Sequence, residues 1–305
     1  MPADFYDVAI IGRGPAGLQA AIHAAGKKVS VIVFGRAERS SLYRAHIANF
    51  CGPKDVVAGK EILETGKKQA EALGAAFLEE DVIETKTEND GFTLTTESGK
   101  TYASTALILA MGVARKKLLV KGEKDFVGRG VTYCVDCDAS FYKDVDVVVV
   151  GNESAAASGA LTLLHYARTV YLVCSKLAIS DSLFKQLQNS KVKLLEGTWI
   201  KEIVGSQAVE GVVLASGETL KVKGVFIELG AKGAMELAAN LGVVFDAETF
   251  SLIETNKKQE TNIPGVYAAG DITGPPWQIA KAVGEGCVAG IEAAEYAKKR
   301  RAEGR

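Results

Sequence analysis

Short apolar runs that end close to a glycine occur twice along the chain, each followed by an alanine-rich stretch and a second apolar run. The two sets are residues 7–11, 18–25 and 29–34, and residues 145–150, 154–164 and 169–173. Continuous apolar runs of this length are typical of strands buried on both faces of a parallel sheet. The pattern therefore predicts two βαβ units, one in each of two domains.

Two other segments alternate between apolar and polar residues. Residues 92–96 reach a turn at Ser98-Gly99, and residues 209–214 reach a turn at residues 216–218, so both predict β-hairpins. The predicted fold class is α/β, with two doubly wound, Rossmann-like domains of three layers, parallel sheets and inserted β-hairpins. The duplication is one of domains, because no short solenoid-type period is present.

Composition narrows the class of protein. A chain of 305 residues suggests about two domains. Lys+Arg 36 against Asp+Glu 37 gives a net charge of −1, which argues against nucleic acid as a partner. No apolar run reaches the roughly 18–20 residues of a membrane span, and the first residues lack the basic region of a secretion signal. An odd count of five cysteines argues against a secreted disulfide scaffold, so we expect a cytoplasmic protein.

The first chemical motif is Gly12-Arg13-Gly14-Pro15-Ala16-Gly17, which fits G-x-G-x-x-G between a predicted strand and a predicted helix. The first glycine allows a tight turn, the second lets the backbone approach a pyrophosphate, and the third lets the helix pack on the strand. Dinucleotide binding is favoured over a plain tight turn. The usual acidic ribose ligand after the second strand is absent, since Phe34-Gly35-Arg36 stands there.

The second motif is Cys134-Val135-Asp136-Cys137. A C-x-x-C in such a chain indicates a redox disulfide, a metal site or unpaired structural thiols. The chain has only three histidines and no second C-x-x-C, so no metal site is predicted and the redox disulfide is favoured. Asp138 follows directly and could exchange a proton with a departing thiolate, with a turn or helix-cap role as the alternative.

The third motif is Gly265–Asp271, a predicted buried strand that ends in Gly270-Asp271. A carboxylate at this point can accept hydrogen bonds from sugar or ribityl hydroxyl groups. Its place near the end of a chain that opens with G-x-G-x-x-G strengthens the prediction of a nucleotide cofactor.

Together these motifs resemble the low-molecular-weight thioredoxin reductase family, and the resemblance covers nearly the whole chain. It implies a discontinuous FAD-binding domain of residues 1–115 and 231–305 around an NADPH-binding-like domain of residues 116–230. It implies a redox pair Cys134/Cys137 assisted by Asp138. The implied FAD-binding residues are Gly12, Gly14, Pro15, Ala16, Gly17, Asn49, Ala110, Gly112, Gly270, Asp271, Gln278, Ile279 and Ala280.

The chain departs from this family in the second βαβ unit. Glu153 stands at the second glycine position of the turn, and Lys176 alone remains where the family has a basic cluster for the 2′-phosphate. Like charges about 4 Å apart cost about 4 kcal/mol at an effective dielectric constant near 20, and a lone lysine cannot replace bidentate arginines. We therefore expect no ordinary use of NADPH, as in family branches that take electrons from ferredoxin or deazaflavin or hold a second flavin.

The sequence thus predicts a flavin-dependent disulfide reductase that reduces thioredoxin or a similar protein, with FAD as cofactor and ferredoxin or another reduced carrier as donor. The resemblance also implies a homodimer. An acidic carrier could use basic patches at residues 116–117, Lys121 and residues 298–301, although a solvated linker and tail explain them as well. The alternatives are an FAD-dependent dithiol oxidase that uses oxygen and a flavin-bound redox sensor. Cys51 could be a third redox thiol or a small packed residue, and Trp277 could lie near the flavin or simply pack.

Overall fold

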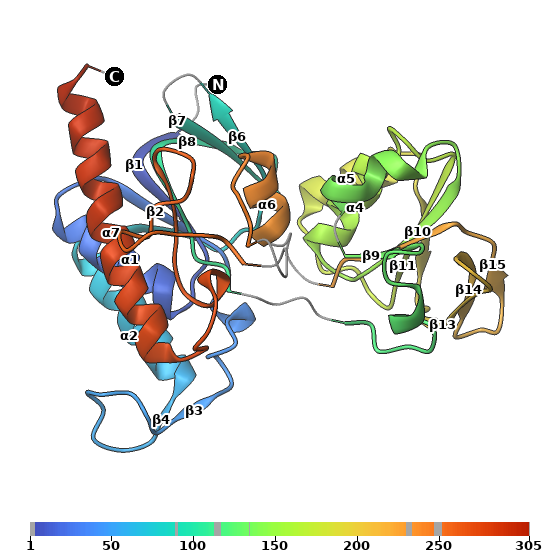
Figure 1. The fold of residues 1–305 in the computed structure, drawn as a ribbon, viewed down its shortest axis with the longest axis horizontal. Helices are drawn as coiled ribbons and strands as arrows, with labels where there is room; N and C mark the ends of the chain where they lie inside the picture. Colours follow the sequence, from blue (N-terminus) through green and yellow to red (C-terminus); the bar gives the residue numbers. More distant parts are fainter. Residues whose placement is uncertain are drawn as a thin grey trace. The chain divides into compact units, whose positions relative to one another are not determined.

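A computed structural model describes residues 4–88, 91–112, 117–133, 135–229, 234–246 and 252–304. The chain divides into two compact units, each labelled by its elements in Figure 1. Unit 1 comprises Met1–Thr96, Lys100–Val113 and Leu237–Arg305, and unit 2 comprises Glu97–Gly99 and Ala114–Glu236. The predicted α/β class with parallel sheets is confirmed.

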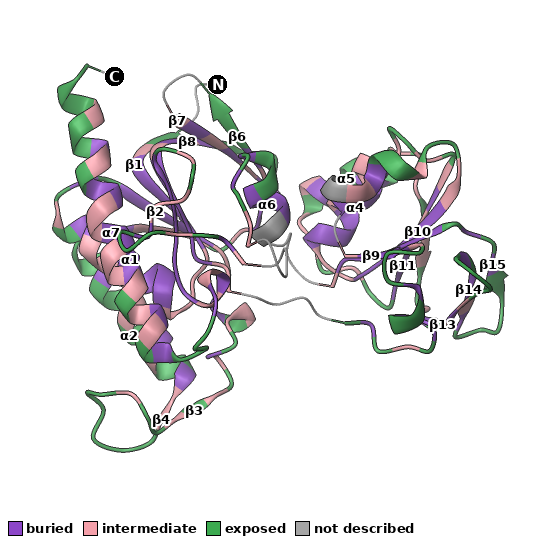
Figure 2. Cartoon of the chain, viewed as in Figure 1, coloured by how far each residue is buried: buried purple, intermediate pink, exposed green. Residues whose placement is uncertain are grey.

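Unit 1 is built on one sheet with the strand order β5-β2-β1-β8-β7-β6, and β17 pairs with β8. Strands β5, β2, β1, β8 and β17 run parallel. Strands β7 and β8 form the predicted antiparallel hairpin around Ser98-Gly99, and β6 pairs antiparallel with β7. The strands are β1 (Asp4–Ile11), β2 (Val31–Phe34), β5 (Ala76–Leu78), β6 (Val82–Glu88), β7 (Gly91–Thr96), β8 (Thr101–Leu109) and β17 (Val266–Ala268). The central strands are buried, as the purple ribbons of Figure 2 show.

The other helices and short strands formed by residues 4–88 and 234–304 lie outside this sheet. They are α1 (Pro15–Gly26), η1 (Ala37–Arg39), β3 (His46–Ile47), β4 (Val57–Ala58), α2 (Gly59–Ala72), α6 (Ala234–Asn240), η4 (Asp271–Thr273) and α7 (Ile279–Ala302). No helix in the described part of the chain is long and apolar enough to cross a membrane.

Helices α1 and α7 pack against each other through small residues (dark blue and red in Figure 1). A Cβ added at Gly286 would lie 2.2 Å from the carbonyl oxygen of Ala16, and one at Gly290 would lie 2.3 Å from that of Ala20. The two backbones therefore touch, with no room for a side chain between them. This contact joins the beginning of the chain to its end.

Asp7 in β1 makes a buried polar link that should show in the pH dependence of stability. Asp7 is 3% exposed, and its carboxylate accepts hydrogen bonds from Arg301 and from the backbone N–H and hydroxyl of Ser30, the latter two at 2.6 and 2.8 Å. Burial alone would raise the pKa of Asp7, but the bonds from Arg301 and Ser30 outweigh it and hold the pKa below the ordinary 3.8.

Asp7→Asn is expected to lower the free energy of unfolding at neutral pH by about 1–3 kcal/mol. Because the folded-state pKa is depressed, the wild-type contribution is present above about pH 4 and is lost on further acidification. Urea unfolding at several pH values measures both effects. Asp4→Asn, at the exposed start of the same strand, is the control, and an equal loss in both variants would contradict the prediction.

Unit 2 contains a five-stranded parallel sheet in the order β12-β11-β10-β16-β9 and a three-stranded antiparallel sheet β13-β14-β15. The parallel strands are β9 (Val131–Thr132), β10 (Asp146–Val150), β11 (Thr169–Cys174), β12 (Lys193–Glu196) and β16 (Gly224–Ile227). The antiparallel strands are β13 (Ile200–Gly205), β14 (Val209–Leu214) and β15 (Thr219–Leu220). The helices are η2 (Lys124–Phe126), α3 (Val135–Asp138), η3 (Ala139–Tyr142), α4 (Ser154–Leu163) and α5 (Asp181–Gln188). The predicted second βαβ unit is thus β10-α4-β11, and the predicted hairpin is β14-β15.

Candidate functional site

The glycine-rich turn joins β1 to α1 as the motif predicts. Gly12 has φ +117°, and a Cβ there would lie 2.2 Å from the carbonyl oxygen of Ala110. A Cβ at Gly17 would lie 1.9 Å from the carbonyl oxygen of Gly12. At Gly14, the position that approaches a phosphate, the nearest heavy atom to an added Cβ is the Ser40 hydroxyl oxygen at 3.4 Å, so the backbone there is not overpacked as it is at Gly12 and Gly17. Pro15 then starts α1, where its missing N–H costs nothing.

Two further segments reach the same edge of the sheet. Ala110 follows β8 and donates its N–H to Ile11 at 2.8 Å, and Gly112 has φ +69°. Gly270 follows β17 with φ +91°, and a Cβ there would lie 2.9 Å from the Cβ of Ala16. Since β1, β8 and β17 are parallel neighbours, their carboxyl ends meet, which is where open α/β sheets bind ligands.

Asp271 begins η4 directly after Gly270. Burial raises the pKa of this carboxyl; the ammonium of Lys281 opposes the rise and the carboxylate of Glu285 adds to it. The group is thus partly desolvated and placed to accept hydrogen bonds from a hydroxyl-bearing ligand.

Sequence reasoning missed two residues at this turn. Lys281 Nζ donates to the carbonyl oxygens of Gly270 at 2.7 Å and Gly274 at 2.8 Å, and pairs with Glu285 at 2.9 Å. Glu285 in turn accepts the N–H of Gly270 at 2.9 Å. Opposite charges spaced i,i+4 on the helix after the Gly-Asp motif are a signal that could have found them.

The structure also brings together residues from the middle of unit 1. Asn49 Nδ2 donates to Gln278 Oε1 at 2.9 Å, which links the β3–β4 region to the N-cap of α7. Ile279 is buried in a cluster with Leu18, Leu42 and Leu63, whereas Ala280 is exposed.

The exposure of Cys51 and of Trp277 bears on the two roles that the sequence left open for each residue. Cys51 is exposed, so the alternative of a small packed residue is wrong. Trp277 is 62% exposed, which argues against plain packing within this chain. Cys174 is buried, and burial together with Glu196 raises its pKa to about 11, so this thiol is unreactive at neutral pH.

The predicted redox pair falls in and beside α3 of unit 2. Cys137 belongs to that helix, but its side chain, like that of Asp136, is not described, and Cys134 lies outside the described residues. Asp138 is described: it accepts a hydrogen bond from the Thr132 hydroxyl. Burial, with a smaller contribution from Asp138, raises the pKa of Tyr142.

Buried glutamates, also missed, bind the Tyr133 side chain beside the motif and the Val135 backbone within it. Tyr133 donates its hydroxyl to Glu123 at 2.7 Å, and the N–H of Val135 donates to Glu228 at 3.1 Å. Glu123 is 1% exposed and Glu228 is 5% exposed. A glutamate that ends the apolar run of β16 is the signal for Glu228, because an acid in that position needs a partner.

In unit 2 the turn after β10 is hydrogen-bonded to the loop that follows β11. Asn152 Oδ1 accepts hydrogen bonds from the backbone and hydroxyl of Ser175, at 3.0 and 3.2 Å, and its carbonyl accepts the N–H of Ala178 at 2.7 Å. The N–H of Leu177 donates to Glu196 at 3.1 Å. The loop after β11, where a dinucleotide-binding domain holds the adenosine ribose, thus packs on the β10–α4 turn. Glu153 stands at the N-cap of α4.

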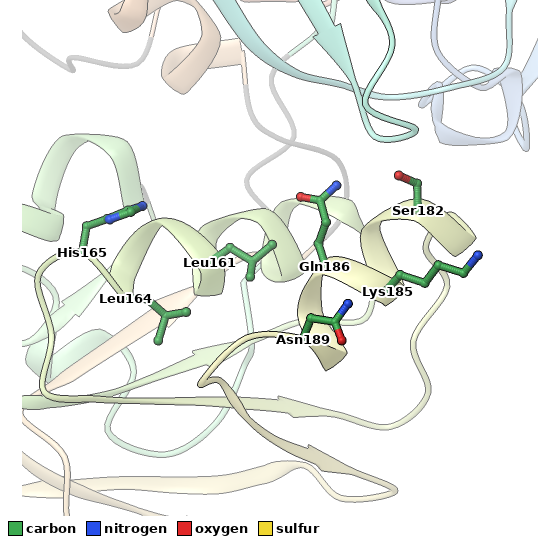
Figure 3. Close-up of a pocket in the computed structure, with 7 residues that line it drawn as sticks. All are labelled: Leu161, Leu164, His165, Ser182, Lys185, Gln186 and Asn189. Atoms are coloured by element: carbon green, nitrogen blue, oxygen red, sulfur yellow. The ribbon is translucent and has the colours of Figure 1, made fainter.

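A depression of ≈ 590 Å³ lies between α4 and α5 (Figure 3). It is lined by Leu161, Leu164, His165, Ser182, Lys185, Gln186 and Asn189. None of the predicted site residues that the structure describes is among them. Within the described residues, no group of three or more His, Cys, Asp or Glu could hold a metal ion.

A model of the pyridine nucleotide-disulphide oxidoreductase family matches residues 6–286, and the chain belongs to this family. Among individual proteins, it is 36% identical to the thioredoxin reductase of Aquifex aeolicus over 284 residues, which is 89% of this chain and 86% of that one.

Two solved structures resemble it over their whole length. The atypical thioredoxin reductase TRi of Desulfovibrio vulgaris Hildenborough has a TM-score of 0.84 and 35% identity, covering 96% of this chain and 98% of that one. A ferredoxin-flavin thioredoxin reductase of Clostridium acetobutylicum has a TM-score of 0.69 and 36% identity, and the match covers 98% of this chain and 100% of that one.

The chain is therefore a thioredoxin reductase-like disulfide oxidoreductase that binds FAD, as the motifs predict. The residues present fit this cofactor. The tight turn from Gly12 to Gly17 and the start of α1 offer backbone groups for a pyrophosphate, and Asp271 offers a half-buried carboxylate for hydroxyl groups.

Proposed function

We propose that this protein reduces thioredoxin or a similar dithiol protein through FAD and a Cys134/Cys137 pair, and that it takes its electrons from a donor other than NADPH, such as ferredoxin. In this proposal residues 1–115 and 231–305 hold the FAD and residues 116–230 carry the dithiol. A homodimer in the cytoplasm is part of the same proposal.

The observation that carries the donor proposal is the hydrogen bonding between the β10–α4 turn and the loop that follows β11 in unit 2. NADPH would place its phosphates at the turn before α4 and its ribose beside the loop that follows β11. Asn152 and Glu196 already occupy the N–H groups of Ser175, Leu177 and Ala178. If a phosphate group bound at that turn, repulsion from the Glu153 carboxylate would weaken its binding by up to about 4 kcal/mol, which is roughly three decades of affinity.

The comparisons and the surface charges support a protein donor. One similar structure is that of a ferredoxin-flavin thioredoxin reductase. Of the cations considered for an acidic carrier, Lys121 pairs with Glu202 at 2.7 Å and Arg301 pairs with Asp7. Lys117, Lys298 and Lys299 are exposed, where an acidic partner can contact them.

The family resemblance assigns the thiol steps as follows. Bound FAD supplies the electron pair that opens the disulfide between Cys134 and Cys137. The Cys134 thiolate then attacks the partner's disulfide and forms a mixed disulfide, and Cys137 displaces the partner's second sulfur, which restores the pair in its oxidised form. Asp138, held by the Thr132 hydroxyl, gives a proton to the leaving thiolate.

The test is anaerobic reduction of the protein-bound flavin by NADPH, NADH, reduced ferredoxin and reduced deazaflavin, followed by its visible absorbance. We expect rapid bleaching with ferredoxin or deazaflavin and none with micromolar NADPH, with dithionite as the positive control. Bleaching by NADPH within seconds would overturn the donor proposal. Peroxide release with a small dithiol under air, without thioredoxin reduction, would instead favour a dithiol oxidase.

A further inference from the structure

Two charged residues of α7 fix the turn that carries Asp271. Lys281 and Glu285 have side chains that are only 15% and 19% exposed, which is unusual for charges one helical turn apart. Between them they bind both backbone polar groups of Gly270: Glu285 accepts its N–H at 2.9 Å and Lys281 donates to its carbonyl at 2.7 Å.

The same pair binds the other end of the turn. Lys281 donates to the carbonyl of Gly274 at 2.8 Å and to the Thr273 hydroxyl at 2.6 Å, and that hydroxyl lies 2.8 Å from Glu285. Gly270 and Gly274 both have positive φ, +91° and +111°. The turn is therefore defined at its first residue, at its last residue and at the side chain between them.

The turn also lies against the glycine-rich motif. A Cβ at Gly270 would be 2.9 Å from the Cβ of Ala16, in the first turn of α1. A displacement of the turn would therefore move Asp271 relative to the start of α1, which carries the other half of the cofactor site.

We propose that Lys281 and Glu285 are positioning residues for FAD: as a pair they hold the Gly270–Gly274 turn against α1 and present the Asp271 carboxylate to a hydroxyl group of the cofactor. This inference is independent of the electron donor and of the thiol partner.

The charges of the pair act on Asp271 in opposite directions, which gives a readout beyond stability. Lys281 lowers the pKa of Asp271 and Glu285 raises it, while the first residues of α1 facing the turn, Pro15 to Leu18, carry no titratable side chain. Removing the lysine should therefore raise the pKa of Asp271 further. An ionised carboxylate accepts two hydrogen bonds from hydroxyl groups, so the variant should lose FAD as the pH falls.

The test measures FAD release from the holoprotein by flavin fluorescence at equilibrium, from about pH 8 to about pH 5. Lys281→Met is expected to raise the Kd for FAD by about 10- to 100-fold, because it leaves the partly buried Glu285 carboxylate without its cation and removes the ammonium donor from the carbonyls of Gly270 and Gly274. The ratio to wild type should grow as the pH falls. Lys281→Met combined with Glu285→Gln should recover most of the affinity.

Lys27→Met is the matched control, because Lys27 pairs with Glu295 of the same helix at 2.8 Å but lies at the far end of α1. It should leave the Kd unchanged. Wild-type affinity in folded Lys281→Met would overturn the proposal, and so would a loss that is equal at every pH and is not relieved by Glu285→Gln. If Lys281→Met fails to fold, Glu285→Gln alone decides: its Kd should depend less on pH than that of wild type, and an unchanged pH profile would refute the proposal.

Discussion

Gly17→Ala is expected to give a protein that binds FAD at least about 100-fold more weakly than the wild type. Alanine normally favours a helix over glycine by about 1 kcal/mol, and Gly17 lies inside α1. Here the added Cβ would lie 1.9 Å from the carbonyl oxygen of Gly12. Overpacking usually costs about 1–3 kcal/mol, and this contact is with the backbone of the cofactor turn, so no side chain can move to relieve it.

Flavin content after purification, and the Kd for added FAD, measure the effect. Gly26→Ala is the matched control: it makes the same change at the last residue of α1, where an added Cβ meets nothing within 4 Å. That variant should keep its FAD and its stability. A Gly17→Ala protein with a full complement of FAD would show that the turn has a different geometry.

The other large expected effect concerns the thiols. Cys134→Ser or Cys137→Ser should each lower the rate of thioredoxin disulfide reduction by at least about 1,000-fold, because each removes one sulfur of a two-thiol exchange. Both variants should retain FAD, since the predicted FAD residues belong to unit 1 and the pair is assigned to unit 2. Stopped-flow reduction of the flavin by the donor should therefore remain close to the wild-type rate.

Cys51→Ser is the control for this experiment, because Cys51 is the one exposed free cysteine among the residues whose side chains are described. Wild-type turnover in that variant would confine the chemistry to the pair. A large loss would show that Cys51 takes part in the exchange, and unchanged turnover in Cys134→Ser would rule out the proposed function.

Local sequence patterns were enough to predict the main parallel strands and the glycine-rich turn. The apolar runs at residues 7–11 and 145–150 became β1 and β10, and the glycine spacing at residues 12–17 predicted a turn whose steric needs the structure explains. These features depend on neighbours in sequence, so the sequence contains them directly.

The residues that support the candidate sites act through contacts between segments that are distant in the sequence. Their roles could therefore not be predicted from local sequence patterns. Glu228, after β16, accepts the N–H of Val135 in α3, and Asn152 accepts the N–H of Ser175. In the sequence, each is an ordinary polar residue. The exposure of Cys51 was missed for the same reason, because a cysteine's burial depends on what folds over it.

The close contact between α1 and α7 has a consequence for how the protein is made. Residues 27–278 separate the two helices, so at about 5–20 residues per second a ribosome exposes α1 tens of seconds before α7 emerges. During that interval Ala16 and Ala20 have no Gly286 or Gly290 against them, and the turn at Gly270 is not yet synthesised. The cofactor site, with the Gly270 turn and α7 packed against α1, can therefore be completed only after residues 270–290 have been synthesised.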